Sequence, residues 1–233
     1  MNGISAILPA AGSSRRFGLK KSKLFFKVDG KPILFYTLKN ISRAYRFREI
    51  LIASHPDNFK EIQKIASALG LHSIVLVPGG ATRAESVRNA LSRVSAKSDW
   101  VLVHDAARPL VSRRIILDAL KSAKKTGGAI TAIPVTATVK RAGPDKVITK
   151  TEDRAALYLA QTPQVFKKEK LLGRYKALGN KAMKLTDEAS FFDGSGMKVM
   201  IAPGEESNLK ITTFEDIELF RFYLKSSASR QRG

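Results

Sequence analysis

The chain opens with ISAILPAAGSSRRFGLKKSK over residues 4–23, an apolar run that passes directly into a loop of small and basic residues. The nearly continuous apolar run Ile4–Leu8 is typical of a strand that is covered on both faces of a sheet. Small residues after it let the backbone approach a ligand closely, and backbone N–H groups beside cations suit a phosphate. The alternative, a tight turn between strand and helix, does not require so dense a group of cations, which comprises Arg15, Arg16, Lys20, Lys21 and Lys23.

Strand-like runs recur along the rest of the chain, at Ile50–Ala53, Ile74–Val77, Trp100–Val103, Ala129–Val135 and Val199–Ala202. Amphipathic helical patterns lie between these runs, and their expected starts are Asp57, Thr82, Ser112 and Thr213. The alternation predicts an α/β fold, namely a Rossmann-like, mostly parallel twisted sheet with helices on both faces. A length of 233 residues suits a single domain over residues 1–233.

The alternation of strands and helices breaks after Val135. From Thr138 to Leu159 the residues are polar and alternating, with a Gly143-Pro144-Asp145 turn between the two halves. This pattern predicts a projecting β-hairpin arm over residues 136–159, and a long surface loop is the alternative.

Positive charge dominates the composition, with 41 Lys plus Arg against 20 Asp plus Glu and a net charge of +21. A nucleic-acid binder, an enzyme for anionic small molecules and a merely basic surface all fit this charge. The cations are scattered and no helix-turn-helix, zinc or RNP signature is present, so we expect no nucleic-acid partner. The absence of cysteine excludes disulfides and predicts a cytoplasmic protein. No apolar run approaches the ~20 residues that span a bilayer, so we expect no membrane partner.

Two other segments carry chemistry by their position. Asp105 ends an apolar strand, which is where ligand sites lie in open α/β sheets, and its carboxylate suits Mg²⁺ or a substrate hydroxyl, with a turn cap as the alternative. The Gly79-Gly80 pair permits close backbone approach to a base, and Ser86 offers a hydroxyl. We expect His104 to be a packed or hydrogen-bonded structural residue, and Pro163 to shape a turn.

The opening loop resembles the signature of nucleotide-sugar pyrophosphorylase-type nucleotidyltransferases. Further motifs, in the same order and spacing, are similar to those of the 2-C-methyl-D-erythritol 4-phosphate cytidylyltransferase family and cover nearly the whole chain. They are GGATRAES (79–86), VLVHDAARP (101–109), IPVTATVKR (133–141), DRAAL (153–157), QTPQ (161–164), TDEA (186–189) and NLKIT (208–212).

The resemblance implies transfer of a cytidylyl group from CTP to 2-C-methyl-D-erythritol 4-phosphate. The products would be 4-diphosphocytidyl-2-C-methyl-D-erythritol and pyrophosphate, in non-mevalonate isoprenoid precursor synthesis. It also implies Mg²⁺, CTP as co-substrate, and a homodimer formed through the arm. The alternative is ribitol 5-phosphate cytidylyltransferase, which shares the loop, the Asp-x-x-Arg-Pro motif and the TPQ turn. The Asp105-Ala-Ala-Arg108 segment together with Asp153-Arg154-x-x-Leu157 favours the methylerythritol branch.

The resemblance also implies roles for individual residues. The catalytic cations are Arg16, Lys23 and Lys210. The CTP-binding residues are Pro9, Ala10, Ala11, Gly12, Ser13, Gly80, Ala81, Arg83, Ser86 and Ala106. The residues for the polyol phosphate are Asp105, Arg108, Thr138, Arg154, Thr162 and Thr186, with Arg154 reaching in from the arm of a dimer partner and Asp105 as the metal ligand. From the residues themselves we read Thr186 as a helix N-cap.

Two positions depart from the family pattern. Ala81 stands where the family often has an acidic residue, which matters only if that side chain helps to reject other bases. The catalytic lysine lies in Ser22-Lys23-Leu24 rather than in Pro-Lys-Gln/Ala. Its spacing from Arg16 is kept, so Lys23 is the expected catalytic lysine, and a shifted register would give that role to Lys20 or Lys21.

Overall fold

A computed structural model of the chain describes residues 3–12, 17 and 22–230. Its centre is a seven-stranded sheet in the order β11-β7-β10-β6-β1-β4-β5. The strands are β1 (Ile4–Pro9), β4 (Glu49–Ser54), β5 (Ile74–Pro78), β6 (Trp100–Val103), β7 (Gly128–Pro134), β10 (Tyr158–Lys167) and β11 (Met200–Pro203). All pairings are parallel except those of β10 with β6 and β7, so the predicted mostly parallel sheet is confirmed.

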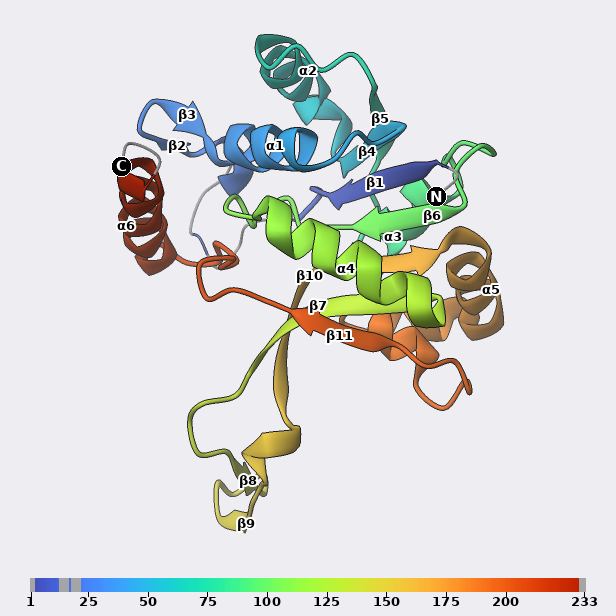
Figure 1. The fold of residues 1–233 in the computed structure, drawn as a ribbon, viewed down its shortest axis with the longest axis vertical. Coiled ribbons are helices and arrows are strands. Elements are labelled where there is room, and N and C mark those ends of the chain that lie inside the picture. The colour runs from blue at the N-terminus through green and yellow to red at the C-terminus, as the bar shows by residue number, and fades with distance from the viewer. Residues whose placement is uncertain (1–2, 13–16, 18–21, 231–233) are drawn as a thin grey trace.

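Helices cover both faces of this sheet (Figure 1). They are α1 (Ile33–Ala44), α2 (Phe59–Ala68), α3 (Arg83–Leu91), α4 (Arg113–Thr126), α5 (Lys168–Leu178) and α6 (Glu215–Arg230). Strand β1 is buried on both sides, because Ala6 and Leu8 pack into the core beneath α1 and α4 while Ile7 packs into the core beneath α3. The nearly continuous apolar run at the start of the sequence therefore reflects a central strand.

The predicted helix starts are confirmed at two positions and shifted at two others. The Thr82 and Ser112 hydroxyls accept from the backbone N–H groups of Glu85 and Ile115, at 3.1 and 3.2 Å, and so cap α3 and α4. The prediction for Asp57 is wrong, because a 3-10 turn over Pro56–Asn58 precedes α2. The last helix, α6, begins at Glu215, two residues after the predicted start, and the Asp216 carboxylate in its first turn accepts from the N–H groups of residues 212 and 213.

Strand β10 replaces the turn expected at Pro163. Its register shifts between Gln161 and Gln164, so that Pro163 lies in a bulge inside the strand. A bulge tolerates proline because no ladder hydrogen bond is required from its missing N–H. Thr162, next to it, lies beside the end of β6 as a result.

The predicted hairpin arm is confirmed. Strand β8 (Lys140–Ala142) pairs antiparallel with β9 (Ile148–Thr151), and the pair extends away from the sheet at the end of β7 and the start of β10 (Figure 1). Val147 and Ile148 near its tip are each 60% exposed. A second small hairpin joins β2 (Lys27–Val28) to β3 (Lys31–Pro32). Among the described residues, no helix has the length and apolar character needed to cross a membrane.

Candidate active site

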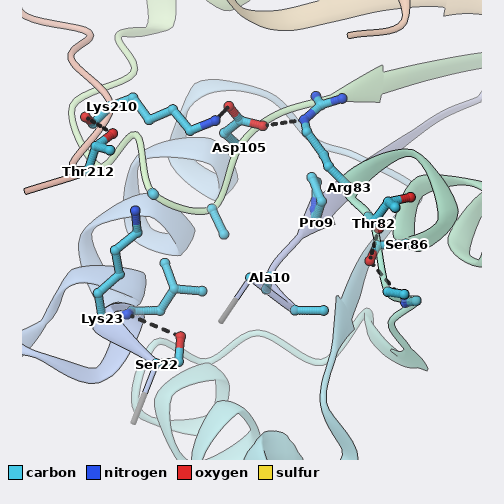
Figure 2. A pocket seen from close by; sticks show the side chains of 17 residues that line it. Pro9, Ala10, Ser22, Lys23, Thr82, Arg83, Ser86, Asp105, Lys210 and Thr212 are labelled. Atoms are coloured by element: carbon cyan, nitrogen blue, oxygen red, sulfur yellow. Dashed lines mark hydrogen bonds and ion pairs between the residues drawn. The ribbon is translucent and has the colours of Figure 1, made fainter. Parts of the chain in front are cut away.

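A cavity of about 710 Å³ opens at the carboxyl ends of the parallel strands β1, β5 and β6, where ligands bind in open α/β sheets (Figure 2). It is lined by Pro9, Ala10, Ala11, Gly12, Ser22, Lys23, Leu24, Gly80, Ala81, Thr82, Arg83, Ser86, Asp105, Ala106, Ala107, Lys210 and Thr212. Most of the residues that the sequence implicates in CTP binding and catalysis therefore share one cavity. Ser13 and Arg16 lie outside the described residues.

The first wall of the cavity is the chain that leaves β1. The N–H of Ala10 donates to the carbonyl of Ala53 at 2.7 Å, and the Ser54 hydroxyl donates to the carbonyl of Ala10 at 3.2 Å. These bonds fix the path of the backbone just after β1 ends at Pro9. This wall has small side chains, at Ala10, Ala11 and Gly12, which is the composition that lets a ligand approach a backbone closely.

The second wall is the glycine turn between β5 and α3. A Cβ at Gly79 would meet the Cβ of Ala11 at 2.3 Å, and one at Gly80 would lie 2.2 Å from Glu85, so both positions require glycine. The Ser86 hydroxyl accepts from the N–H of Gly80 and donates to the carbonyl of Thr82, both at 3.0 Å. Ser86 thus holds the turn in shape, rather than presenting a hydroxyl without a partner to a base.

Asp105 is the charged centre of the third wall. Its Oδ1 accepts from Arg83 Nε at 2.9 Å and its Oδ2 accepts from Lys210 Nζ at 2.8 Å, while Arg108 Nε lies 3.9 Å from Oδ2. Burial alone would raise the pKa of Asp105, but Arg83 and Lys210 hold it well below its usual range. The carboxylate is therefore charged at neutral pH and fixes two cations at the cavity wall.

The surroundings of Asp105 do not fit a metal held by the protein. Both of its oxygens already accept from cations, and a divalent ion there would be repelled by Arg83, Arg108 and Lys210. Over the described part of the chain, no group of three or more His, Cys, Asp or Glu side chains is placed to hold a metal ion. The sequence prediction of Asp105 as a metal ligand therefore lacks support from the donors around it.

Thr162 and His104 fix the backbone of Asp105. Burial lowers the pKa of His104 to about 4, so the ring is neutral at neutral pH. Its Nε2 donates to the carbonyl of Arg108 at 3.0 Å, which leaves Nδ1 to accept from the Thr162 hydroxyl at 3.0 Å. The hydroxyl in turn accepts from the N–H of Asp105 at 3.0 Å. The structural role predicted for His104 is confirmed, and Thr162 lies behind the cavity wall.

The remaining residues predicted for the polyol phosphate lie outside the cavity lining. Arg108 is mostly buried and donates from Nη1 to the carbonyl of Asn208 at 2.6 Å. Thr138 and Arg154 are exposed on the arm, where Arg154 Nη1 donates to the carbonyl of residue 136 at 2.5 Å.

The helix N-cap predicted at Thr186 is wrong. Thr186 is exposed in a bend, and the short 3-10 helix that follows it begins at Ala189. The Asp187 carboxylate makes the capping bond, because it accepts from the N–H of Ser190 at 3.1 Å.

Lys23 reaches the cavity from a short 3-10 helix over Lys23–Phe25. The Ser22 hydroxyl caps this turn by accepting from the N–H of Leu24 at 3.4 Å. In Figure 2 the Lys23 side chain extends toward the side of the cavity where Lys210 and Thr212 lie. The altered Ser22-Lys23-Leu24 segment therefore still delivers a lysine to the cavity.

Several lining residues are not among the site residues predicted from the sequence, namely Ser22, Leu24, Thr82, Ala107 and Thr212. Each adjoins a predicted site residue, so its motif contained the signal. Glu188 is not among the predicted site residues either. The structure places it on Arg83, at 2.7 Å from Nη1, which no local spacing indicates because the two are 105 residues apart.

The chain is similar to one family of known proteins over nearly its whole length. The family model described as IspD: 2-C-methyl-D-erythritol 4-phosphate cytidylyltransferase matches residues 4–226. The protein of that name from Haemophilus influenzae (strain PittGG) is 40% identical over 222 residues, which are 95% of this chain and 96% of that protein. The "Bifunctional enzyme IspD/IspF" of Desulfotalea psychrophila is 37% identical over 221 residues, and the chain spans 56% of its length.

A solved structure agrees with these sequence relatives. The 4-diphosphocytidyl-2C-methyl-D-erythritol synthase of Anaerococcus prevotii superposes with a TM-score of 0.85 at 33% identity. The superposition covers 96% of this chain and 99% of that one.

Proposed function

The chain belongs to the 2-C-methyl-D-erythritol 4-phosphate cytidylyltransferase family, and we propose that the cavity around Asp105 is its active site. The enzyme transfers the cytidylyl group of CTP to 2-C-methyl-D-erythritol 4-phosphate and releases pyrophosphate, in non-mevalonate isoprenoid precursor synthesis. The observation that carries the assignment of the site is the Arg83–Asp105–Lys210 cluster. It lines the same cavity as the small-residue backbone after β1.

The reaction needs positive charge rather than a base. An oxygen of the polyol phosphate attacks the α-phosphorus of CTP, and the bond between that phosphorus and the bridging oxygen breaks, so that its electron pair leaves with pyrophosphate. The attacking phosphate is already ionised at neutral pH. Lys23 and Lys210, with Arg16, neutralise the charge that develops on the phosphoryl and leaving oxygens.

The cytosine ring is recognised at the glycine turn. Gly80 and Ala81 line the cavity, and their N–H groups donate to Ser86 Oγ at 3.0 Å and Glu85 Oε2 at 2.8 Å, so the turn keeps its shape beside the base. The backbone of Pro9–Gly12 takes the triphosphate, with Ser13 continuing the same loop. Arg83 and Ala106, which line the same cavity, complete the proposed CTP site.

Asp105 receives a hydroxyl of the methylerythritol moiety, and the groups behind it set its position. From outside the cavity, Arg108 forms a 3.9 Å ion pair with this carboxylate, and the Thr162 hydroxyl accepts from the backbone N–H of Asp105 at 3.0 Å. Mg²⁺ would come with the phosphates of CTP, since the donors around Asp105 do not fit it. Thr138 and Arg154 act on the polyol phosphate from the arm of a second copy of the chain.

Substrate specificity is tested with a panel of nucleoside triphosphates against two polyol phosphates, with pyrophosphate release as the readout. We expect the highest kcat/KM with CTP and 2-C-methyl-D-erythritol 4-phosphate. Ribitol 5-phosphate is expected to react at least about tenfold less efficiently, because a site built to bond particular hydroxyls is penalised when they are misplaced. A preference for ribitol 5-phosphate would overturn the choice of substrate and leave the site assignment in place.

The arm is proposed as the dimer contact, because it carries apolar side chains that are exposed in one copy. Val147, Ile148, Tyr158 and Leu159 are each between 47% and 60% exposed on the arm and at the start of β10. Such a patch is typical of a surface that a partner covers.

A single domain over residues 1–233 and a cytoplasmic location remain predictions.

Ile148→Asp is expected to weaken this dimer and lower the activity together. A charge in an apolar interface is costly, so light scattering should show a mass near the 25.6 kDa of one chain, against twice that value for the unaltered protein. Activity should fall because Arg154 no longer reaches the neighbouring cavity. Leu219→Asp, at a 44% exposed position on α6, is the matched control. An unaltered protein that is monomeric and fully active would contradict the proposal.

A further inference from the structure

Glu188 is a buried carboxylate to which the mechanism above gives no task. Its side chain is 0% exposed, and both of its oxygens accept from Arg83 Nη1, at 2.7 and 3.0 Å. Burial raises the pKa of Glu188, and Arg83 counteracts that rise. A charge this deeply buried destabilises a fold unless it is paired, and Arg83 is its partner.

Arg83 is held between two carboxylates. Its Nε donates to Asp105 Oδ1 at 2.9 Å, while its Nη1 faces Glu188, so the two carboxylates occupy different parts of one guanidinium. Nη2 is buried and has no hydrogen-bond partner among the described residues. Asp105 therefore engages Arg83 with one oxygen, and its other oxygen accepts from Lys210 at 2.8 Å.

The sheet itself fixes the backbone that carries Glu188. Gln164, which is 1% exposed on β10, accepts with Oε1 from the N–H groups of Glu188 and Ala189, at 3.1 and 3.2 Å. Its Nε2 donates to Asp187 Oδ2 at 2.8 Å. The position of Glu188 is thus set by a central element of the fold rather than by a surface loop.

The numbers of positive and negative side chains around Arg83 indicate how its contacts would change without the charge of Glu188. Three cations, Arg83, Arg108 and Lys210, face the two carboxylates Asp105 and Glu188. With Glu188 neutral, the three cations would share a single carboxylate. A guanidinium prefers to bind a carboxylate with two parallel N–H groups, so Arg83 would then compete with Lys210 for Asp105 Oδ2.

We infer that Glu188 is a positioning residue, which holds Arg83 to one oxygen of Asp105 and so keeps the other oxygen for Lys210. The inference rests on the proposed roles of Asp105 and Lys210 in the transfer reaction. It adds to the active site a residue that lies outside the cavity lining and acts through Arg83. Groups that orient the ligands of a metal ion are commonly worth 10–100-fold in activity, and we expect a similar scale for a group that orients Arg83.

Glu188→Gln tests this inference because it keeps the size of the side chain and removes its charge. We expect kcat/KM for 2-C-methyl-D-erythritol 4-phosphate to fall about 10–100-fold, with a smaller change in KM for CTP. Glu188→Asp, which restores the charge at a shorter reach, should recover part of the loss. Asp193→Asn is the matched control, because Asp193 is an exposed acidic residue of the same segment, and its activity should stay within about twofold.

A double variant separates positioning through Arg83 from a general structural effect. If Glu188 acts through Arg83, adding E188Q to R83Q should cause no further loss of kcat/KM. The double variant removes both partners of the buried Arg83–Glu188 pair, so neither is left as an unpaired charge. If E188Q alone does not fold, comparing kcat/KM of the double variant with that of R83Q still tests the inference. Activity of E188Q within twofold of the unaltered enzyme would overturn the inference. So would a loss of kcat/KM in the double variant that equals the product of the losses in R83Q and E188Q. An inactive unaltered enzyme would instead refute the proposed function.

Discussion

Lys23→Ala is expected to lower kcat for cytidylyl transfer by on the order of 10²–10³, the largest single effect in the cavity. Lys23 lines the cavity on the same side as Lys210, and its ammonium group would neutralise charge that develops only as the bond to pyrophosphate breaks. A cation that acts in this way lowers the barrier more than it tightens CTP binding. Steady-state kinetics should therefore show kcat falling by a larger factor than KM for CTP rises.

The matched control is Lys27→Ala, which removes an exposed lysine from the neighbouring strand β2 and should leave turnover within about twofold. Measuring Lys20→Ala and Lys21→Ala beside Lys23→Ala shows which of the three lysines is the catalytic one. Loss of turnover in one of these two variants, with near-normal turnover in Lys23→Ala, would show that the catalytic lysine has been misassigned.

Asp105→Asn is the second change with a large expected effect. Asparagine keeps the shape of the side chain but leaves Arg83, Arg108 and Lys210 with only the charge of Glu188 to balance them. We expect the free energy of unfolding to fall by about 3 kcal/mol, as when one partner of a buried ion pair is removed. We expect kcat/KM for the polyol phosphate to fall on the order of 10²-fold, because a buried charged hydrogen bond to the substrate is lost.

The pH dependence of stability provides a second measurement on Asp105→Asn. Because the folded-state pKa of Asp105 lies below its ordinary value, its contribution is present above the unfolded pKa of ~3.9 and is lost as the pH falls toward the folded value. The variant should therefore lose less stability on acidification than the unaltered protein. Asp99→Asn, an exposed aspartate just before the same strand β6, is the control. Equal acid sensitivity of Asp105→Asn and the unaltered protein would contradict the account of the cluster.

Central strands and capped helices were predictable from the sequence, because their signals are local. Ile4–Leu8 is apolar since both faces of β1 are covered, and Ser112 caps α4 through a bond to a residue three positions later. Strand β10 was not predictable in the same way. Its first residues are exposed and Pro163 interrupts it, so the segment has the composition of a turn until its pairing with β6 and β7 is known.

The residues of the candidate site likewise differ in whether a local sequence signal reveals them. Asp105, Gly80 and the loop after β1 stand at strand ends, and a strand end can be read from the sequence. The contact of Glu188 with Arg83 joins residues far apart in the chain, and its geometry depends on the bond from Gln164 to the segment around Glu188. No periodicity or spacing contains that information, because it arises only when β10 inserts into the sheet.

A crystal structure with the product 4-diphosphocytidyl-2-C-methyl-D-erythritol would show whether one cavity holds both halves of the reaction around Asp105. We predict cytosine against the backbone of Gly80 and Ala81, the diphosphate between Lys23 and Lys210, and a hydroxyl of the methylerythritol moiety on Asp105. A product bound outside this cavity, or bound with its diphosphate away from both lysines, would contradict the account.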